Sequence, residues 1–181
     1  MTRNGILALL VFIVLVGALL IVWKTSAQPS IQQPIAYNHK RHISEGLACK
    51  DCHKSALTGE AAGRPSEQTC RDCHDPGELE EGTEGKNPEI VKLLTYLKEK
   101  AQIPWRRIFQ LPEHVYFSHV RHATVAKVAC ETCHGPMAEA VRPPSAPLVS
   151  ITMDFCINCH VQQRSARAGA ATTRDCNACH K

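Results

Sequence analysis

The chain has 181 residues, enough for one modest domain and an appendage, and its formal net charge is only +4. No run of five or six like charges occurs, so a nucleic-acid-binding surface is not indicated. Cysteine is the outlier: ten cysteines stand beside ten histidines, while aromatic residues make up only 5%, which is thin for a protein core.

The N-terminal segment predicts a transmembrane helix. Residues 6–23 carry no charge, and at about 1.5 Å per residue they would form roughly 27 Å of helix, enough to cross a bilayer. Thr25, Ser26 and Ala27 resemble a cleavage site, so removal is an alternative, but the apolar region of a signal peptide is usually shorter. We therefore expect residues 1–27 to be an anchor with a short cytoplasmic tail, followed by a linker over 28–36.

From residue 37 onward, every cysteine belongs to one repeated pattern. Five pairs have the spacing Cys-x-x-Cys, and a histidine follows each pair at once. That succession separates this form from a bare Cys-x-x-Cys. The pairs are Cys49/Cys52, Cys70/Cys73, Cys130/Cys133, Cys156/Cys159 and Cys176/Cys179, and the histidines that follow them are His53, His74, His134, His160 and His180.

Haem attachment explains this spacing. Two thiols separated by two residues in a helical turn can add across the two vinyl groups of a haem, and the next residue then supplies an axial imidazole to the iron. Structural zinc takes four ligands and needs no histidine after each pair. A disulfide framework would not fix the spacing, and a thioredoxin-like site needs one motif rather than five. The pattern predicts five covalently attached haem c groups.

Five further histidines match the second axial position of these haems. A low-spin haem iron needs one ligand beyond the porphyrin and the motif histidine. Met153 and Met137 lie close to motifs and are the alternative ligands, although each would more often fill the core. The histidines outside the motifs are His39, His42, His114, His119 and His122.

Two stretches of the chain are an internal repeat. Residues 37–53 and 117–134 each contain an aromatic residue, a polar residue, two histidines three apart, and Ala-Cys-x-x-Cys-His. His114 has no counterpart in the first stretch and matches the extra haem of the second. We expect a haem domain over 37–181, divided into a two-haem unit at 37–80, a connecting helix at 81–104 and a three-haem unit at 105–181. Asn87 and Pro88 mark the start of that helix.

The haems are expected to serve as the core of this domain. About 31 residues per haem are too few to build separate pockets, so the rings must pack against one another. The expected fold is mostly α and irregular: one N-terminal transmembrane helix and a compact multihaem domain of short helices. Because haem c is attached on the outer face of the membrane, we expect a single-pass inner-membrane protein with its haem domain on the periplasmic side.

The motifs resemble those of the class III multihaem cytochromes, the c3 and c7 types. In that family the first histidine of a His-x-x-His pair usually ligates the haem that follows it, and the second a haem further away. The resemblance therefore implies that His39 serves the Cys49/Cys52 haem and His119 the Cys130/Cys133 haem. It leaves the haems of His42, His114 and His122 open.

A narrower resemblance concerns the stretch IPWRRIFQLPEHVYFSHVRH, residues 103–122. Together with five haem motifs and an N-terminal span, it resembles the pentahaem cytochrome subunit of alternative complex III. That implies an electron-transfer subunit, not itself an enzyme, which relays electrons from a membrane quinol-oxidising respiratory or photosynthetic complex. Its partners would be the other subunits, the lipid bilayer, and a soluble cytochrome c, copper protein or oxidase as acceptor.

Three other functions remain open at this point. A stand-alone membrane-anchored quinol dehydrogenase of the NapC/NrfH type has a similar layout, but its first motif follows the span more closely than Cys49 follows Trp23. A catalytic multihaem enzyme, such as a nitrite reductase, needs an iron with an open position. Electron storage, or an extracellular wire without quinone chemistry, needs neither a complex nor an open iron.

Overall fold

The structure is a computed structural model that describes residues 3–26, 30–81, 87–166 and 175–181. Two compact units divide the chain, Met1–Ser30 and Ile31–Lys181, and each is described by itself. The predicted boundary between anchor and linker falls at residues 27–29, outside the described residues. The predicted division of the haem domain into units of two and three haems stays a prediction.

The first unit holds one helix, α1 (Arg3–Ser26). Within the part of the chain that the structure describes, no helix is long and apolar enough to span a membrane. This finding contradicts the predicted transmembrane anchor and the single-pass inner-membrane location that depended on it.

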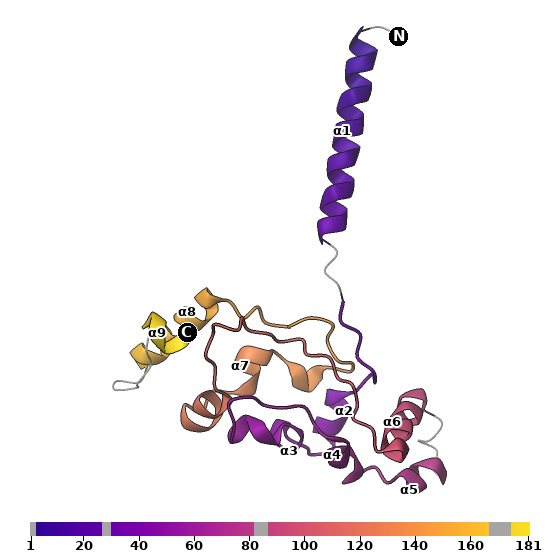
Figure 1. The fold of residues 1–181 in the computed structure, drawn as a ribbon, viewed down its shortest axis with the longest axis vertical. Helices are drawn as coiled ribbons and strands as arrows, with labels where there is room; N and C mark the ends of the chain where they lie inside the picture. Colours follow the sequence, from indigo (N-terminus) through magenta and orange to yellow (C-terminus); the bar gives the residue numbers. More distant parts are fainter. Residues whose placement is uncertain (1–2, 27–29, 82–86, 167–174) are drawn as a thin grey trace. The chain divides into compact units, whose positions relative to one another are not determined.

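The second unit consists of short helices joined by irregular chain (Figure 1). This part of the expected fold, mostly α and irregular, agrees with the structure. Among the described residues the one β pairing is an isolated antiparallel bridge between Val115 and His180. The elements are α2 (His39–Ser44), α3 (Cys49–Cys52), η1 (Lys54–Leu57), α4 (Glu67–Arg71), α5 (Pro76–Glu81), α6 (Pro88–Glu99), the π-helical turn η3 (Val120–Val125), α7 (Cys130–His134), η4 (Met137–Glu139), α8 (Met153–Ala166) and α9 (Cys176–Cys179).

Helix α6 begins and ends at residues whose chemistry explains its bounds. The Asn87 side chain accepts a hydrogen bond of 2.9 Å from the Glu89 N–H, and Pro88 occupies the first turn, where its missing N–H costs nothing. The helix ends at Lys100, which adopts a left-handed conformation with φ of 52°. Leu93, Leu94 and Leu97 form its buried face.

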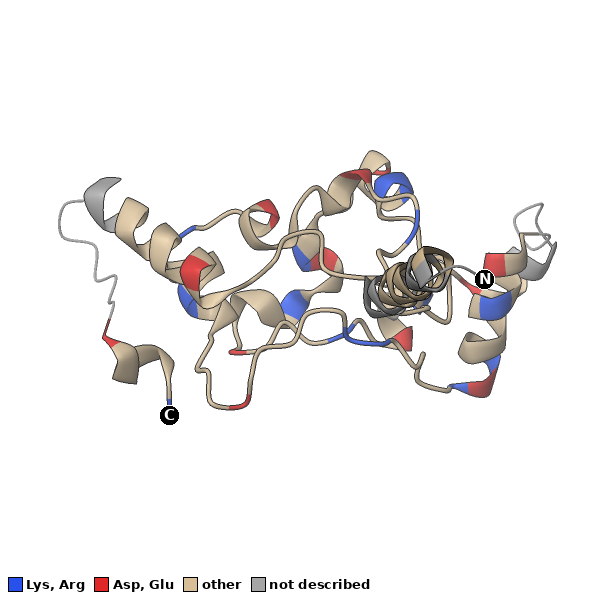
Figure 2. Cartoon of the chain, turned by 90° about the horizontal axis from the view of Figure 1, so that it is seen from above, with Lys and Arg blue, Asp and Glu red and all other residues tan. Residues whose placement is uncertain are grey.

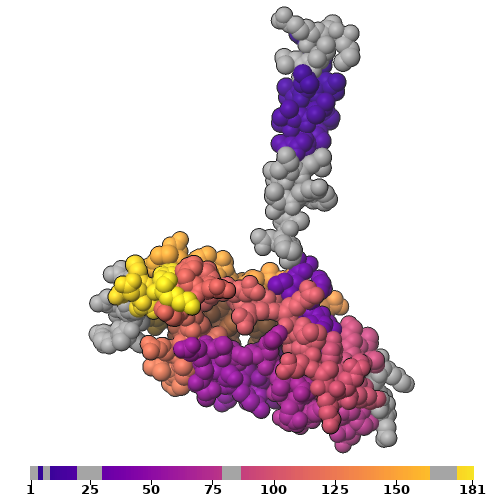
Figure 3. Space-filling view, in the orientation of Figure 1, coloured from indigo at the N-terminus to yellow at the C-terminus, as the bar shows by residue number. Residues whose placement is uncertain are grey.

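The apolar core is small for a unit of this size. Leu97 alone is fully buried among the described side chains, and Cys70, Tyr96 and Trp105 pack against the cluster around it. A domain of about 150 residues ordinarily buries roughly 70% of its unfolded surface, so a large part of the expected apolar interior is missing. The surface is also hollowed between the segment around residue 50 and the segment around residue 110 (Figure 3). The buried apolar side chains are Ile35, Leu93, Leu94, Leu97 and Ile103.

Backbone hydrogen bonds join each copy of the internal repeat to the segment that follows the other copy. The His119 and Val120 N–H groups donate to the carbonyls of Glu60 and Gly59 at 2.9 and 3.0 Å, which ties η3 to the loop after η1. On the other side, the Lys40 N–H donates to Ala140 O at 3.1 Å, which ties α2 to η4. The repeat therefore folds back on itself and brings its two histidine pairs into one unit.

Charged side chains contribute little to this association. Basic and acidic residues are interspersed over the second unit (Figure 2). The ion pair between Lys40 and Glu139, at 2.9 Å, joins α2 to η4, but both side chains are more than half exposed. Exposed pairs of this kind stabilise a protein by about 0–1 kcal/mol, so the unit needs another source of cohesion.

Candidate haem-binding sites

Four of the five Cys-x-x-Cys motifs lie wholly within a helix, namely α3, α7, α8 and α9. Two cysteines three residues apart lie on the same face of a helical turn. The backbone N–H of the following histidine closes that turn. All ten thiols are free, so these cysteines form no disulfide in the structure. The closing bonds include His53 N to Cys49 O at 2.9 Å, His74 N to Cys70 O at 2.8 Å and His180 N to Cys176 O at 2.8 Å.

The second motif differs from the other four at Cys73. Helix α4 contains Cys70 but ends at Arg71, so Cys73 lies in the turn that follows the helix. The Cys73 N–H still donates to Cys70 O at 3.2 Å, and this tighter bond, which spans three residues, continues the turn as far as the histidine. The role of Cys73 in haem attachment stays a prediction.

Exposure also distinguishes this motif from the other four. In those four the first cysteine is exposed and the second is half-buried, whereas Cys70 is half-buried and Cys73 is exposed. The reason is local packing, because Cys70 lies against the apolar cluster around Leu97. The five motifs, which look equivalent in the sequence, therefore present their thiols differently.

Four of the five motif histidines face a histidine from elsewhere in the chain. If one iron lies between two imidazoles, bonds of about 2.0 Å place the ring centroids about 6 Å apart. Three pairs agree with that separation, and the fourth is shorter by less than an ångström. The centroid distances are 6.1 Å for His42–His74, 6.3 Å for His119–His134, 6.0 Å for His122–His160 and 5.4 Å for His114–His180.

The remaining two histidines are His39 and His53. Burial, and next the neighbouring His53, lower the pKa of His39 to about 4. Burial also lowers the pKa of His53. Each imidazole is therefore held in its neutral form, which is the form that binds a metal.

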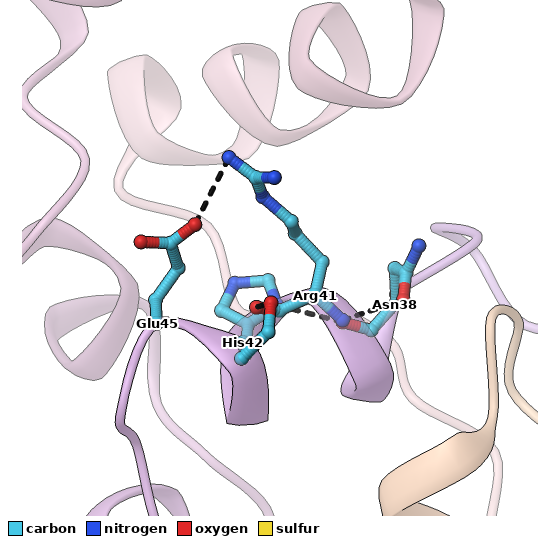
Figure 4. Close-up of polar contacts among 5 residues, drawn as sticks. Asn38, Arg41, His42 and Glu45 are labelled. Atoms are coloured by element: carbon cyan, nitrogen blue, oxygen red, sulfur yellow. Dashed lines mark hydrogen bonds and ion pairs between the residues drawn. The ribbon is translucent and has the colours of Figure 1, made fainter.

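Backbone carbonyls orient several of these imidazoles through Nδ1. His42 Nδ1 lies 2.8 Å from Asn38 O, and His122 Nδ1 lies 2.8 Å from Ser118 O, one helical turn earlier in each repeat. The first of these turns is further fixed by the Asn38 side chain, which accepts from Arg41 N at 2.9 Å (Figure 4). A hydrogen bond from Nδ1–H to a carbonyl selects the tautomer that leaves Nε2 free for a metal.

The same arrangement holds for two further imidazoles. His119 Nδ1 lies 2.9 Å from Glu60 O, across the interface between the two repeat copies. A hydrogen bond to the Gly63 backbone opposes the lowering of the His53 pKa. Histidines that ligate a metal commonly have such hydrogen-bond partners on their other ring nitrogen.

One aromatic ring supports each His-x-x-His pair. Tyr37 stacks on His42 with centroids 4.3 Å apart and meets His39 edge-on at 4.7 Å. Phe117 does the same for His122 at 4.6 Å and His119 at 4.8 Å. Sequence reasoning did not assign this role, although the aromatic residue two positions before each pair was the available signal.

Two buried polar side-chain atoms of the described residues lack a hydrogen-bond partner, namely His39 Nδ1 and Trp105 Nε1. Trp105 packs near Tyr37, with ring centroids 6.5 Å apart, and against the cluster that contains Cys70. A buried indole N–H without an acceptor costs about 1–3 kcal/mol. A carboxylate on a bound group, such as a haem propionate, would supply that acceptor.

The donor groups therefore fit haem better than a bare metal ion. Among the described residues, no three His, Cys, Asp or Glu side chains converge as a zinc site requires. Two imidazoles complete the coordination sphere of an iron only where a macrocycle fills the four other positions. Because each motif histidine has a histidine beside it, the arrangement also favours histidine over Met153, whose side chain is 62% exposed, or Met137.

Thiols of different motifs lie close to one another. Burial, followed by the field of the neighbouring Cys130, raises the pKa of Cys49. Burial raises the pKa of Cys133, with Cys159 as its next cause, and that of Cys156, with Cys179 as its next cause. The edges at which haems would be attached are thus neighbours in space.

The family comparisons agree with the motifs. Residues 41–101 match the family model described as cytochrome c3, and residues 115–181 match the model described as cytochrome c7 and related cytochrome c. Two regions of the chain are thus similar to multihaem cytochromes of the c3/c7 type, families that hold covalently attached c-type haems. It is also similar to the "Menaquinone reductase, multiheme cytochrome c subunit" of Nitratidesulfovibrio vulgaris, at 27% identity over 83% of this chain and 77% of that protein.

Proposed function

We propose that this chain is an electron-transfer subunit that carries five covalently attached c-type haems and works within a larger quinone-linked complex. The proposal is carried by one observation: four of the five Cys-x-x-Cys-His motifs have a second histidine whose ring centroid lies 5.4–6.3 Å from that of their own. At the fifth motif, His53 is an electrostatic neighbour of His39. When bound, the haems would supply reversible one-electron chemistry.

The paired histidines argue for a carrier rather than a catalyst. Two imidazoles would fill both axial positions of each iron, so no position would remain for a substrate. The chain's own residues would fix the rings by two thioethers, orient the axial imidazoles through carbonyls such as Asn38 O and Ser118 O, and exclude water by burial. The interpretation as a multihaem nitrite reductase is therefore disfavoured.

Two lines of support connect the chain to quinone chemistry, and they support opposite directions of electron transfer. The similar protein from Nitratidesulfovibrio vulgaris is named as a subunit of a menaquinone reductase, which supports transfer toward a quinone. The stretch at residues 103–122 resembles the pentahaem subunit of alternative complex III, which supports transfer from a quinol to a soluble cytochrome c, a copper protein or an oxidase. We infer that another subunit of such a complex would bind the quinone.

Haem stoichiometry tests the first part of the proposal. Intact mass should exceed the 20.0 kDa of the chain by roughly 3 kDa, the mass of five haems, and a pyridine haemochrome assay should give five per chain. The reduced protein should bind no carbon monoxide, and the oxidised protein should show low-spin ferric signals alone. Fewer haems, or a substantial high-spin signal in fresh protein, would count against the assignment.

Co-purification tests the second part. The chain tagged at its C-terminus and isolated from its native host should bring at least one quinone-binding subunit with it. The isolated complex is then tested with a menaquinol analogue plus an oxidised acceptor, and with a menaquinone analogue plus a reduced donor, to fix the direction. If the chain purifies alone and oxidises the quinol analogue unaided, it is a stand-alone dehydrogenase of the NapC/NrfH type. If it purifies alone without quinone activity, it serves storage or conduction.

A further inference from the structure

The order of the haem sites in space differs from their order in the sequence. The sites are numbered by their motifs along the chain, so that site 1 contains Cys49/Cys52 and site 5 contains Cys176/Cys179. The contacts of the second unit connect these sites one to the next.

The first repeat copy joins site 1 to site 2. Tyr37 contacts both His39 and His42 at 4.7 and 4.3 Å, and those two imidazoles belong with His53 of site 1 and His74 of site 2. The thiols repeat this link, because Cys52 is an electrostatic neighbour of both Cys70 and Cys73.

The second repeat copy forms the same kind of link between sites 3 and 4. Phe117 contacts His119 and His122, which face His134 of site 3 and His160 of site 4. A helix that presents two histidines three residues apart thus holds two neighbouring sites in each copy.

Sites 1 and 3 meet across the interface between the copies. Cys130 is an electrostatic neighbour of Cys49. Glu60 O, in the loop that follows site 1, accepts from both the backbone N–H and the Nδ1 of His119 at 2.9 Å. Thr124 Oγ1 donates to Leu57 O at 2.7 Å and fixes η3 against η1.

Sites 4 and 5 meet at the C-terminal end. Cys156 has Cys179 as an electrostatic neighbour. The extended segment before η3 binds site 5, because Tyr116 N donates to Cys179 O at 2.8 Å and Lys181 N donates to His114 O at 2.9 Å. That segment also leads directly into His119 and His122, so one stretch of chain connects sites 3, 4 and 5.

We propose that the five haems form one unbranched chain in the order 2–1–3–4–5, with the Cys70/Cys73 haem and the Cys176/Cys179 haem as its two ends. This inference rests on the proposed function. The motif helices follow the same order across the second unit in Figure 1: α4, α3, α7, α8 and α9. Electrons enter at one end and leave at the other, and each step moves one electron between neighbouring irons without breaking a bond.

The direct test is NMR of the fully reduced, diamagnetic full-length holoprotein. Each haem is assigned through contacts between its thioether protons and the cysteine β-protons of its own motif. Nuclear Overhauser cross-peaks between haem substituents are expected for the pairs 2–1, 1–3, 3–4 and 4–5. A cross-peak from haem 2 to haem 3, 4 or 5, or absence of the 1–3 peak, overturns the order. A count other than five haems would contradict the proposed function, and this result is distinct from a wrong haem order.

A matched pair of variants tests the central link. Thr124→Val removes the hydroxyl that ties η3 to η1, whereas Thr95→Val removes a hydroxyl that bonds within α6, to Val91 O at 3.1 Å. Chemical shifts of haem substituents should change at haems 1 and 3 in the first variant and at neither of them in the second. Shifts that change mainly at haems 2 and 5 in Thr124→Val would contradict a 1–3 contact there.

Discussion

At the scale of single residues, the pairing of histidines depends on contacts between distant parts of the chain. His114 and His180, for example, lie together where the Lys181 N–H donates to His114 O at 2.9 Å. A count of ten histidines for ten axial positions holds no information on such distances. The assignment of His39 and His119 to the haems that follow them stays a prediction, with His53 as an electrostatic neighbour of His39 and the ring centroid of His134 6.3 Å from that of His119.

His114 gives the sharpest residue-scale prediction, because it lies outside both repeat copies. His114→Ala should keep all five haems attached, since thioether formation does not use the second axial ligand, but one haem should lose its low-spin state. The reduced variant should then bind about one carbon monoxide per chain, and that haem's potential should rise. Glu113→Ala, at the neighbouring exposed position, is the control and should bind none. If every haem of His114→Ala stays low-spin, the fifth axial ligand lies elsewhere.

Tyr37 provides a second test, because its ring supports the ligands of two sites at once. Tyr37→Ala removes the contacts to both His39 and His42, so the electron paramagnetic resonance signals of two haems should change together. Tyr37→Phe keeps the ring, as Phe117 does in the second copy, and should leave those signals in place. A change confined to one haem in Tyr37→Ala would show that the two sites do not share this support.

At the scale of elements, local signals predicted α6 and missed η3. The start of α6 is encoded by Asn87 and Pro88, and its apolar positions repeat with a helical period. The π-helical turn η3 has no such signal, because its N-terminal N–H groups are satisfied by the carbonyls of Glu60 and Gly59 from the other repeat copy. A pattern within one segment cannot report a hydrogen-bond partner that lies about sixty residues away.

The same limit applies to the thiols of the second motif. That motif has the same spacing as the other four, so nothing in the sequence distinguishes it from them. The difference comes from Cys70, which packs against a cluster built by α6 and leaves Cys73 exposed beyond the end of α4. Motif spacing therefore does not predict how exposed each thiol is.

Leu97 tests the contribution of α6 to stability. Its side chain is 0% exposed at the centre of the apolar cluster, and removing such a side chain typically costs about 2–5 kcal/mol. Leu97→Ala should therefore lower the midpoint of thermal unfolding of the holoprotein by several degrees, measured by circular dichroism. Val91→Ala, on the exposed face of the same helix, should shift it little. Equal shifts in both variants would mean that the cluster is not a core.

Two glycines separate backbone strain from steric contact. Gly135, directly after α7, has φ of 71°, and an added Cβ would lie 2.9 Å from Leu148 Cβ. Gly46 has φ of 90°, and nothing lies within 4 Å of its added Cβ. Gly46→Ala should cost about 1–2 kcal/mol from the left-handed conformation alone. Gly135→Ala should cost more, because its φ of 71° and ψ of −168° lie in a region essentially restricted to glycine and the clash with Leu148 adds to that strain. Thermal unfolding measures both variants, and an equal or smaller loss in Gly135→Ala would contradict this order.

At the scale of the whole molecule, composition predicted the shortage of core better than it predicted the N-terminal unit. The low aromatic content led to the expectation that haems replace an apolar core, and the described residues of the second unit bury few apolar side chains. The predicted transmembrane anchor came from a count of uncharged residues over 6–23, and the described part of α1 does not bear it out.

The small core makes the last prediction a test of what folds the second unit. The cluster around Leu97 involves α6 and its immediate neighbours, while the five motif turns are short helices whose cysteines are partly or fully exposed. Helices this short are not stable alone.

The chain produced without haem attachment, by replacing all ten motif cysteines with alanine, should therefore lack a cooperative thermal transition. Its far-ultraviolet circular dichroism should show much less helix than the holoprotein. His114→Ala, which keeps every thioether, should still unfold cooperatively and serves as the control. A haem-free chain that melts cooperatively near the holoprotein's midpoint would mean that the polypeptide supplies its own core, and the assignment of the hollow interior to haem would fail.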